Sequence, residues 1–150
     1  MEFRKADASD IDLLINFRKN QLMDEGQTPE FDLDSYLRTY FSQGLADGSL
    51  IQYIAVENGE NIATGGVQFF PFAPCWELGN GKTAFIFSMY TAPKHRKRGI
   101  ARDILNLLID TAKAHDCCIV RLQASDEGRV VYEKIGFTSS HSFMRLEFEN

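Results

Sequence analysis

The chain has 150 residues, 44% of them hydrophobic, and its 16 Lys/Arg and 21 Asp/Glu give a net charge of -5. This length suits one domain with a substantial core, and the acidic balance argues against a general nucleic-acid surface, which needs a broad basic face. No apolar run approaches the roughly 20 residues of a membrane span, and Met1 leads into Glu2-Phe3-Arg4-Lys5 without a signal-peptide core. We therefore expect a cytoplasmic protein with no membrane or nucleic-acid partner.

The first third of the chain predicts a short strand followed by two helices. Residues 2–6 suit the strand, and Ser9 followed by Asp12 matches a capping box before a helix with apolar residues at helical spacing. After an acidic loop, Asp32 or Asp34 can cap a second helix, which has apolar and aromatic residues along one face.

A hairpin is predicted next. The second helix should end before Gly48, a residue type typical of helix ends. Residues 51–56 and 62–72 then alternate as strands do, and between them Asn58 and Gly59 supply the positive φ angles of a type I′ turn. The pattern indicates neighbouring antiparallel strands.

The second half of the chain predicts a strand, a helix and a parallel strand. Residues 84–91 form a strand that runs into a basic turn and a helix, and residues 118–124 form a buried strand. Such a βαβ unit should be right-handed. A short helix from about residue 126 should end at Gly136, and residues 143–148 make a last strand. The sequence thus predicts a mixed sheet with helices on its faces.

The basic turn is the most informative stretch. Five of the chain's 16 Lys and Arg residues lie between Lys94 and Arg102, around Gly99. Glycine lets the backbone approach a ligand, and the free N–H groups of a helix's first turn point toward it, so a strand, a glycine turn and a helix start together indicate an anion site, with phosphate as the expected ligand. We expect the neighbouring His95 to be a surface histidine.

The three cysteines are predicted to be structural. Cys75, Cys117 and Cys118 are odd in number and two are adjacent, so they provide neither a disulfide framework nor a zinc spacing. We expect reduced thiols that pack as small apolar groups.

Three stretches together carry a family resemblance. Residues 96–101 (RKRGIA) match the signature R/Q-x-x-G-x-G/A, residues 89–93 (MYTAP) precede it, and residues 132–137 (YEKIGF) contain Y-x-x-x-G-F. With the order of elements above, the whole chain resembles the GNAT (GCN5-related N-acetyltransferase) superfamily. The resemblance implies a single acetyltransferase domain over residues 1–150. Its fold would be α/β (α+β), a mixed sheet of about six to seven strands with about four helices, splayed between the fourth and fifth strands.

The resemblance also implies acetyl-coenzyme A as co-substrate, with no metal. The main-chain N–H groups from Lys97 to Arg102 would hold the pyrophosphate, and the backbone of residues 89–91 would pair with the pantetheine arm as an added strand. The residues expected to bind the co-substrate are Met89, Tyr90, Thr91, Arg96, Lys97, Arg98, Gly99, Ile100, Ala101, Arg102 and Ser125.

Tyr132 occupies the family's general-acid position. A phenol with a pKa near 10 is protonated at neutral pH and can protonate the departing thiolate; the alternative is a core tyrosine. Ser125 stands where many relatives carry Asn, and it would either hydrogen-bond the pantetheine or cap the following helix.

The general base is not evident in the sequence. Many relatives carry a Glu on the fourth or fifth strand, but residues 84–90 and 118–124 contain no carboxylate. Deprotonation of the amine could use water held by backbone carbonyls, or one of Glu77, Glu127 and His141.

The expected reaction is acetyl transfer to a primary amine of a small molecule or peptide by direct attack in a ternary complex. The connection between the first two helices borders the family's acceptor cleft, and its acidic residues would suit a cationic amine unless they only form a solvated loop: Asp24, Glu25, Glu30, Asp32 and Asp34. The missing strand carboxylate leaves a non-catalytic acyl-coenzyme A binding or sensing module as the alternative. The protein would be a monomer or a homodimer.

Overall fold

The computed structural model describes residues 1–140 and 142–149. Two short 3-10 turns, Ala8–Asp10 and Pro93–His95, accompany the main elements. Within the described residues these elements are, in chain order, β1 (Glu2–Lys5), α1 (Ile11–Asp24), α2 (Asp34–Asp47), β2 (Leu50–Glu57), β3 (Glu60–Pro71), β4 (Lys82–Thr91), α3 (Ile100–Ala114), β5 (Ile119–Leu122) and α4 (Asp126–Ile135).

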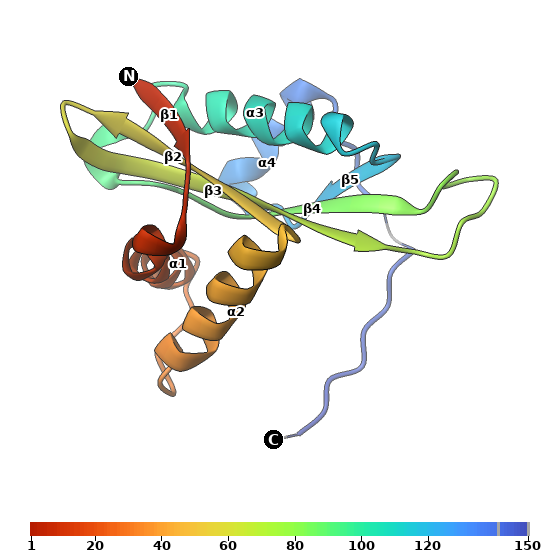
Figure 1. The fold of residues 1–150 in the computed structure, drawn as a ribbon, viewed down its shortest axis with the longest axis horizontal. Coiled ribbons are helices and arrows are strands. Elements are labelled where there is room, and N and C mark those ends of the chain that lie inside the picture. Colours follow the sequence, from red (N-terminus) through yellow and green to blue (C-terminus); the bar gives the residue numbers. More distant parts are fainter. Residues whose placement is uncertain (141, 150) are drawn as a thin grey trace.

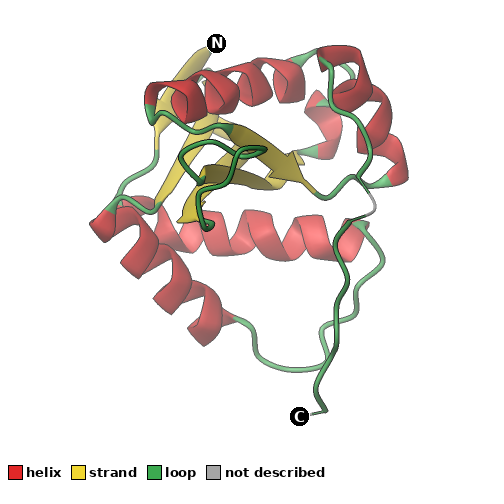
Figure 2. Ribbon diagram, turned by 90° about the vertical axis from the view of Figure 1, so that its right-hand side faces the viewer, coloured by secondary structure: helices red, strands yellow, loops and turns green. Residues whose placement is uncertain are grey.

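The strands form one mixed sheet in the order β1-β2-β3-β4-β5 (Figure 1). Neighbours are antiparallel except β4 and β5, which are parallel and joined through α3, as the sequence predicts. Helices α1 and α2 cover one face and α3 and α4 lie on the other, so the sheet is the middle layer (Figure 2). The class is therefore the predicted one, with five strands in the described residues rather than six or seven.

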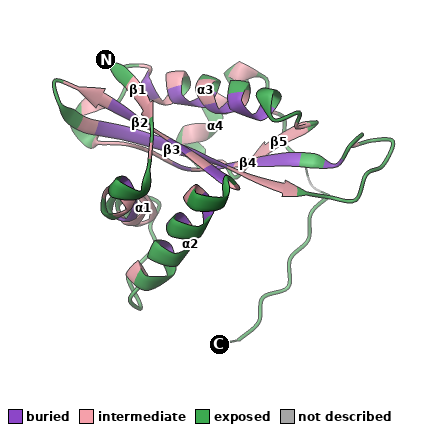
Figure 3. Cartoon of the chain, viewed as in Figure 1, coloured by how far each residue is buried: buried purple, intermediate pink, exposed green. Residues whose placement is uncertain are grey.

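Two apolar cores hold these layers together, one on each face of the sheet. The larger core packs α3 against the strands through residues such as Ile104 and Leu108, and the smaller core packs α1 and α2 through Leu14 and Phe41; all four side chains are fully buried. The buried colour accordingly follows the sheet-facing sides of the helices (Figure 3).

Most predicted turns and helix ends are confirmed. Asn58 and Gly59 both have positive φ, at 51° and 78°, as a type I′ turn requires. Gly48 ends α2 and Gly136 ends α4 in the left-handed conformation. No helix in the described residues has the length and apolarity needed to cross a membrane.

The predicted helix starts are partly wrong. The capping box at the beginning of the chain uses Asp7 and Asp10 instead of Ser9 and Asp12: Asp7 accepts from the N–H of Ser9 at 2.8 Å, and Asp10 accepts from the N–H of Asp7 at 2.9 Å. The N-cap residue of α2 is Leu33, and of the two predicted aspartates Asp32 accepts a hydrogen bond from the first helical N–H, that of Asp34, at 3.0 Å. The reason at the first helix is tertiary, because Arg4 on β1 holds the Asp10 carboxylate in two hydrogen bonds.

The predicted strand over residues 143–148 is wrong. These residues form no regular element, and the side chains of Met144, Leu146 and Phe148 are 96%, 80% and 84% exposed. The ribbon leaves the domain as an extended tail (Figure 1). Alternating hydrophobicity predicts a strand only if a neighbouring strand pairs with its N–H and C=O groups, and none does so here within the described residues.

The cysteines are free, but only Cys117 is partly buried, and it packs at the margin of the α3 core. Burial raises the pKa of the Cys117 thiol, and the neighbouring Cys118 raises it further. Cys75 and Cys118 are exposed, so the expectation that all three pack as small apolar groups is wrong for these two.

Candidate functional site

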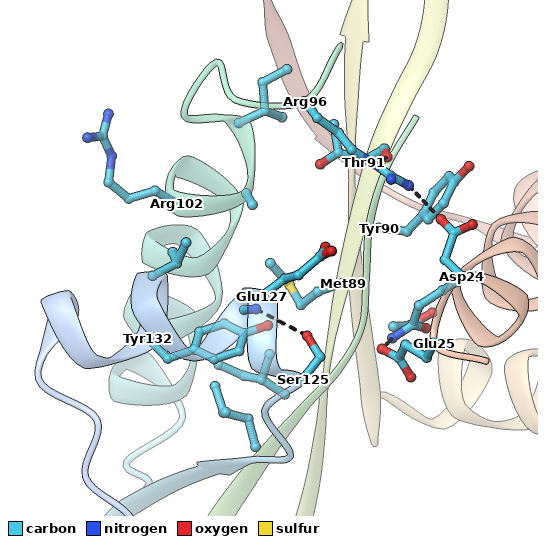
Figure 4. Close-up of a pocket in the computed structure, with 18 of the residues that line it drawn as sticks. Asp24, Glu25, Met89, Tyr90, Thr91, Arg96, Arg102, Ser125, Glu127 and Tyr132 are labelled. Carbon is cyan, nitrogen blue, oxygen red and sulfur yellow. Dashed lines mark hydrogen bonds and ion pairs between the residues drawn. The ribbon is translucent and has the colours of Figure 1, made fainter. Parts of the chain in front are cut away.

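The sheet opens between β4 and β5. The two strands pair only over residues 83–86 of β4 and 119–122 of β5, whereas β4 continues to Thr91 while still paired with β3. From Phe87 onward, no strand of the described residues therefore pairs with the other edge of β4. A cleft of about 890 Å³ begins at this opening and is bordered by α1, α3 and α4 (Figure 4).

A bulge in β4 marks the place where the strands separate. Ser88 has a φ of 57°, and Ser88 and Met89 together face Gly65 of β3, so the pairing register shifts by one residue. A Cβ on Gly65 would lie 2.5 Å from Met89 Sδ and 2.6 Å from Ile104 Cγ2. Glycine at this position leaves room for the Met89 side chain between β3 and α3. Because a bulge bends its strand, the bulge at Ser88 helps to direct β4 away from β5.

The basic turn leads into the N-terminus of α3 at one end of the cleft. Lys97 and Gly99 have φ angles of 61° and 81°, and Gly99 is the N-cap residue of α3. Within the described part of the chain, no N–H group from Lys97 to Arg102 donates to a protein acceptor. A row of unpaired N–H groups at a helix N-terminus can bind a phosphate without further side chains.

The side chains of this turn are more often paired than the sequence suggested. Arg98 forms two hydrogen bonds with Glu57 at 2.7 and 2.9 Å, and Lys94 pairs with Glu60 at 2.9 Å. Arg96 donates to the carbonyl of Thr91 at 2.9 Å and pairs with Asp24 at the end of α1. These carboxylates explain part of the charge cluster that the sequence assigned to a bound anion alone.

His95 is not the surface residue that the sequence indicated. Its side chain is 13% exposed, its Nδ1 lies 2.9 Å from Arg98 Nη1, and its Nε2 is buried with no partner in the described residues. The ring lines the cleft beside the basic turn.

Tyr132 reaches the cleft from the opposite side, on α4. Its ring is half-buried and its hydroxyl has no hydrogen-bond partner in the described residues; it points toward Met89 and Ser125 (Figure 4). Burial raises the pKa of this phenol, and the negative charge of Glu25 raises it further. The hydroxyl is therefore protonated at neutral pH and is available to donate a proton.

Gly128 makes room for this ring, and sequence analysis missed it. A Cβ on Gly128 would lie 2.9 Å from Cε2 of Tyr132 and 3.1 Å from the Ser125 hydroxyl. Ser125 is the N-cap of α4 and accepts from the N–H of Gly128 at 3.1 Å, so the capping alternative is the one observed. The signal available in the sequence was a glycine inside a short helix, four residues before the tyrosine.

The cleft contains carboxylates although its strands carry none. Glu127 on α4 lines it, as do Asp24 and Glu25 at the end of α1. Glu77 lies in the exposed loop before β4 and outside the cleft lining, and His141 falls outside the described residues. Glu25 was considered only as part of an acidic loop, because nothing in the sequence places the end of α1 beside α4.

The predicted site residues converge on this one cleft. Its walls include every one of them except Arg98, namely Met89, Tyr90, Thr91, Arg96, Lys97, Gly99, Ile100, Ala101, Arg102, Ser125 and Tyr132. In residues 1–140 and 142–149, no group of three or more His, Cys, Asp or Glu side chains could hold a metal ion. The arrangement joins an anion-binding end, an open strand edge and a protonated phenol.

Comparisons with known proteins agree with this geometry. The model of the acetyltransferase (GNAT) family matches residues 16–137. A crystal structure of a predicted acetyltransferase with acetyl-CoA from Clostridium acetobutylicum superposes with a TM-score of 0.94; it is 40% identical, and the match covers 97% of this chain and 95% of that one.

More distant structures share the fold. A GCN5-related N-acetyltransferase from Ralstonia eutropha JMP134 has a TM-score of 0.89 at 21% identity, covering 97% of each chain. Glucosamine-6-phosphate N-acetyltransferase from Arabidopsis thaliana has a TM-score of 0.76 at 22% identity, covering 99% of this chain and 98% of its own. A search of curated proteins finds no match.

Proposed function

The chain belongs to the GNAT family of acetyltransferases, and we propose that it transfers an acetyl group from acetyl-coenzyme A to a primary amine, with Tyr132 as the general acid. One observation carries the proposal: the start of α3 with its unpaired N–H groups (Lys97 and residues 99–102), the open edge of β4 and Tyr132 all line a single cleft. A phosphate-bearing thioester has a use for each of these three parts.

The donor would lie along the cleft with its pyrophosphate at the basic turn. The N–H groups at the start of α3 meet the phosphate oxygens, and the exposed side chains of Lys97 and Arg102 add positive charge. The pantetheine arm extends along β4 beyond Phe87, where the strand has backbone groups free to pair with it. The relative from Clostridium acetobutylicum, whose crystal structure includes acetyl-CoA, supports this choice of donor.

The reaction is a direct attack. The amine nitrogen adds to the thioester carbonyl carbon, and a backbone N–H of β4 near Met89 or Tyr90 stabilises the negative oxygen. The C–S bond then breaks, and the departing thiolate takes the Tyr132 proton, which solvent restores. The proton lost by the amine passes through water to a cleft carboxylate, for which Glu25 and Glu127 are the candidates.

A non-catalytic acyl-coenzyme A module would use the same cleft without turnover. The sequence argument for it was the absence of a carboxylate on the central strands. Glu25 and Glu127 weaken that argument, because α1 and α4 bring carboxylates to the same place. Steady release of free thiol from acetyl-coenzyme A in the presence of an amine panel would exclude such a module. If the protein binds acetyl-coenzyme A but releases no thiol with any amine, the non-catalytic module is supported.

Tyr132→Phe tests the acid. The change keeps the ring against Phe137, whose centroid lies 6.1 Å away, and removes only an unpaired hydroxyl, so stability and donor affinity should hardly change. A general acid contributes typically about 10²–10⁴-fold, and because a thiolate is already a fair leaving group we expect a fall in kcat near the lower end. A normal kcat, measured by thiol release at saturating acetyl-coenzyme A, would make Tyr132 a packing residue.

A further inference from the structure

A second cavity, of about 300 Å³, lies on the α1–α2 face of the sheet. It is separate from the donor cleft in its lining, but Phe87 belongs to the walls of both, at the point where β4 loses its β5 partner. Its walls are mostly aromatic, and its polar side chains come from α1, α2 and β3: Arg18, Tyr40 and Gln68, with Phe41, Phe85 and Phe87. An acceptor held there would approach the thioester from the face opposite α3.

Arg18 gives this cavity a positive charge that forms no ion pair within the described residues, although Glu25 acts on it from a distance. Its only hydrogen bond in the described residues runs from Nη1 to Gln21 Oε1 at 2.8 Å, and no Asp or Glu of that part of the chain pairs with it. Arg4 and Arg38, by contrast, have carboxylate partners at 2.8 and 2.6 Å. Desolvation lowers the pKa of Arg18, but a guanidinium stays charged. A half-buried positive charge without an ion-pair partner would be stabilised by binding an anionic group.

The other polar groups of the cavity fit the same partner. The Tyr40 hydroxyl donates to Gln68 Oε1 at 2.6 Å, which leaves the amide N–H groups of Gln68 as donors. No residue lining this cavity carries a carboxylate. The donor cleft has Glu25 at its border, and Gln21 lies between this carboxylate and Arg18, because it accepts from Arg18 and donates to Glu25 at 3.1 Å.

We infer that the acceptor is an amine that also carries a carboxylate, held by Arg18 and Gln68 while its apolar part packs on Tyr40, Phe85 and Phe87. A carboxylate suits this site better than a phosphate because one guanidinium offers one positive charge and a planar fork, whereas a phosphate monoester has a charge near -2. The inference rests on the proposed acetyl transfer and replaces the cationic acceptor that the acidic residues of the α1–α2 connection suggested.

Matched amine pairs test the inference. Phenylalanine and 2-phenylethylamine, leucine and isopentylamine, and 5-aminopentanoate and butylamine differ within each pair by the carboxylate alone. We expect kcat/KM, measured by thiol release, to favour at least one carboxylate-bearing member by about 10–100-fold, the usual effect of a hydrogen-bonded charge pair. Arg18→Gln should bring that ratio close to one by raising KM, and Arg18→Lys should leave an intermediate ratio.

Arg38→Gln is the matched control, because Arg38 is an exposed arginine of α2 that does not line the cavity. It should keep the wild-type preference. Preference for butylamine-type partners, for spermidine or for phosphoethanolamine would overturn the carboxylate assignment, as would an equal loss of preference in Arg38→Gln. In each of these cases an amine is still acetylated, and the proposed function stands.

Binding separates the two proposals without turnover. For the pair with the largest kinetic preference, the acetylated product that carries the carboxylate should bind the wild-type protein about 10–100-fold more tightly than the product without it, with the difference lost in Arg18→Gln. The increase in Tm with acetyl-coenzyme A should be equal in wild type and Arg18→Gln. Failure of acetyl-coenzyme A to stabilise the wild type contradicts the proposed function, whereas equal binding of the two acetylated products contradicts the acceptor class.

Discussion

Gly128→Ala should slow catalysis by moving the Tyr132 ring while leaving the fold intact. The added Cβ would lie 2.9 Å from Cε2 and 3.3 Å from Cζ of Tyr132, where carbon atoms in good contact stay about 3.5–4.0 Å apart. The ring must therefore retreat by about 0.5–1 Å at Cε2, and because it pivots at Cβ, its hydroxyl moves farther. A displacement of about 1 Å in a catalytic group can cost up to about 10²-fold, so we expect kcat to fall by about 10–100-fold.

Stability should change little in the same variant. Alanine inside a helix is favoured over glycine by about 0.5–1 kcal/mol, whereas a Cβ placed 3.1 Å from the Ser125 hydroxyl disturbs an N-cap worth about 1 kcal/mol. These effects nearly cancel. Urea unfolding should therefore place Gly128→Ala within about 1 kcal/mol of the wild type. Lys134→Ala, at an exposed position of the same helix, is the control that changes neither property.

The double variant Gly128→Ala/Tyr132→Phe shows whether both changes act through the hydroxyl. If they do, its kcat equals that of Tyr132→Phe alone, because residues acting in one step give non-additive losses. The measurement is thiol release at saturating acetyl-coenzyme A for all four proteins. A wild-type kcat in Gly128→Ala, together with a low kcat in Tyr132→Phe, would refute the steric argument, and additive losses would place the effect of Gly128 elsewhere.

The remaining predictions concern the anion site and two titrating groups. In the wild type, acetyl-coenzyme A at 100 times its Kd should stabilise the fold by about 2.7 kcal/mol and raise Tm. Gly99→Asp should abolish this rise, because it places a negative charge at the start of α3. An unchanged rise would locate the pyrophosphate elsewhere. Burial raises the pKa of Tyr40 to about 12, so the stability that its neutral form contributes is complete below about pH 10 and is lost as pH rises toward 12. Tyr40→Phe should flatten this alkaline decline in the free energy of unfolding. An unchanged decline in the variant would show that Tyr40 is not its source. Hydrogen bonds from Arg4, opposed by burial, keep the pKa of Asp10 below its ordinary value, so its contribution to stability is present above about pH 4 and is lost as pH falls further. Asp10→Asn should therefore lower the free energy of unfolding by about 1–3 kcal/mol at pH 7. If wild type and variant still differed by the same amount at pH 2, the ion pair would be excluded as the source.

Local chemistry in the sequence was enough to predict the positions of the helices and the turn type of the hairpin. Asn58 and Gly59 dictate a tight turn through their own backbone preferences, and Gly99 beside a helix start indicates a phosphate site wherever the rest of the chain lies. Such features depend on neighbours within a few residues. The turn type and the positions of the helices could therefore be predicted from spacing alone, and the phosphate site stays a prediction.

Features that depend on distant partners could not be predicted in this way. Arg98 pairs with a carboxylate 41 residues away, and the capping register of the first helix follows from Arg4 on another element. The last strand was predicted from alternation alone, which specifies a face but not a pairing partner. The predictions fail at these places because ion pairs and strand pairs form between surfaces that only the folded chain brings together.

The sequence by itself determined the family resemblance, the order of the elements as far as α4 and the glycine turn before α3. The tertiary structure alone decided that β4 parts from β5 at Phe87, that Glu25 and Tyr132 border the same cleft, and that Arg18 forms no ion pair within the described residues. The physical reason is that backbone preference and periodicity act over one or two turns of chain, whereas charge pairing, desolvation and close packing act through space.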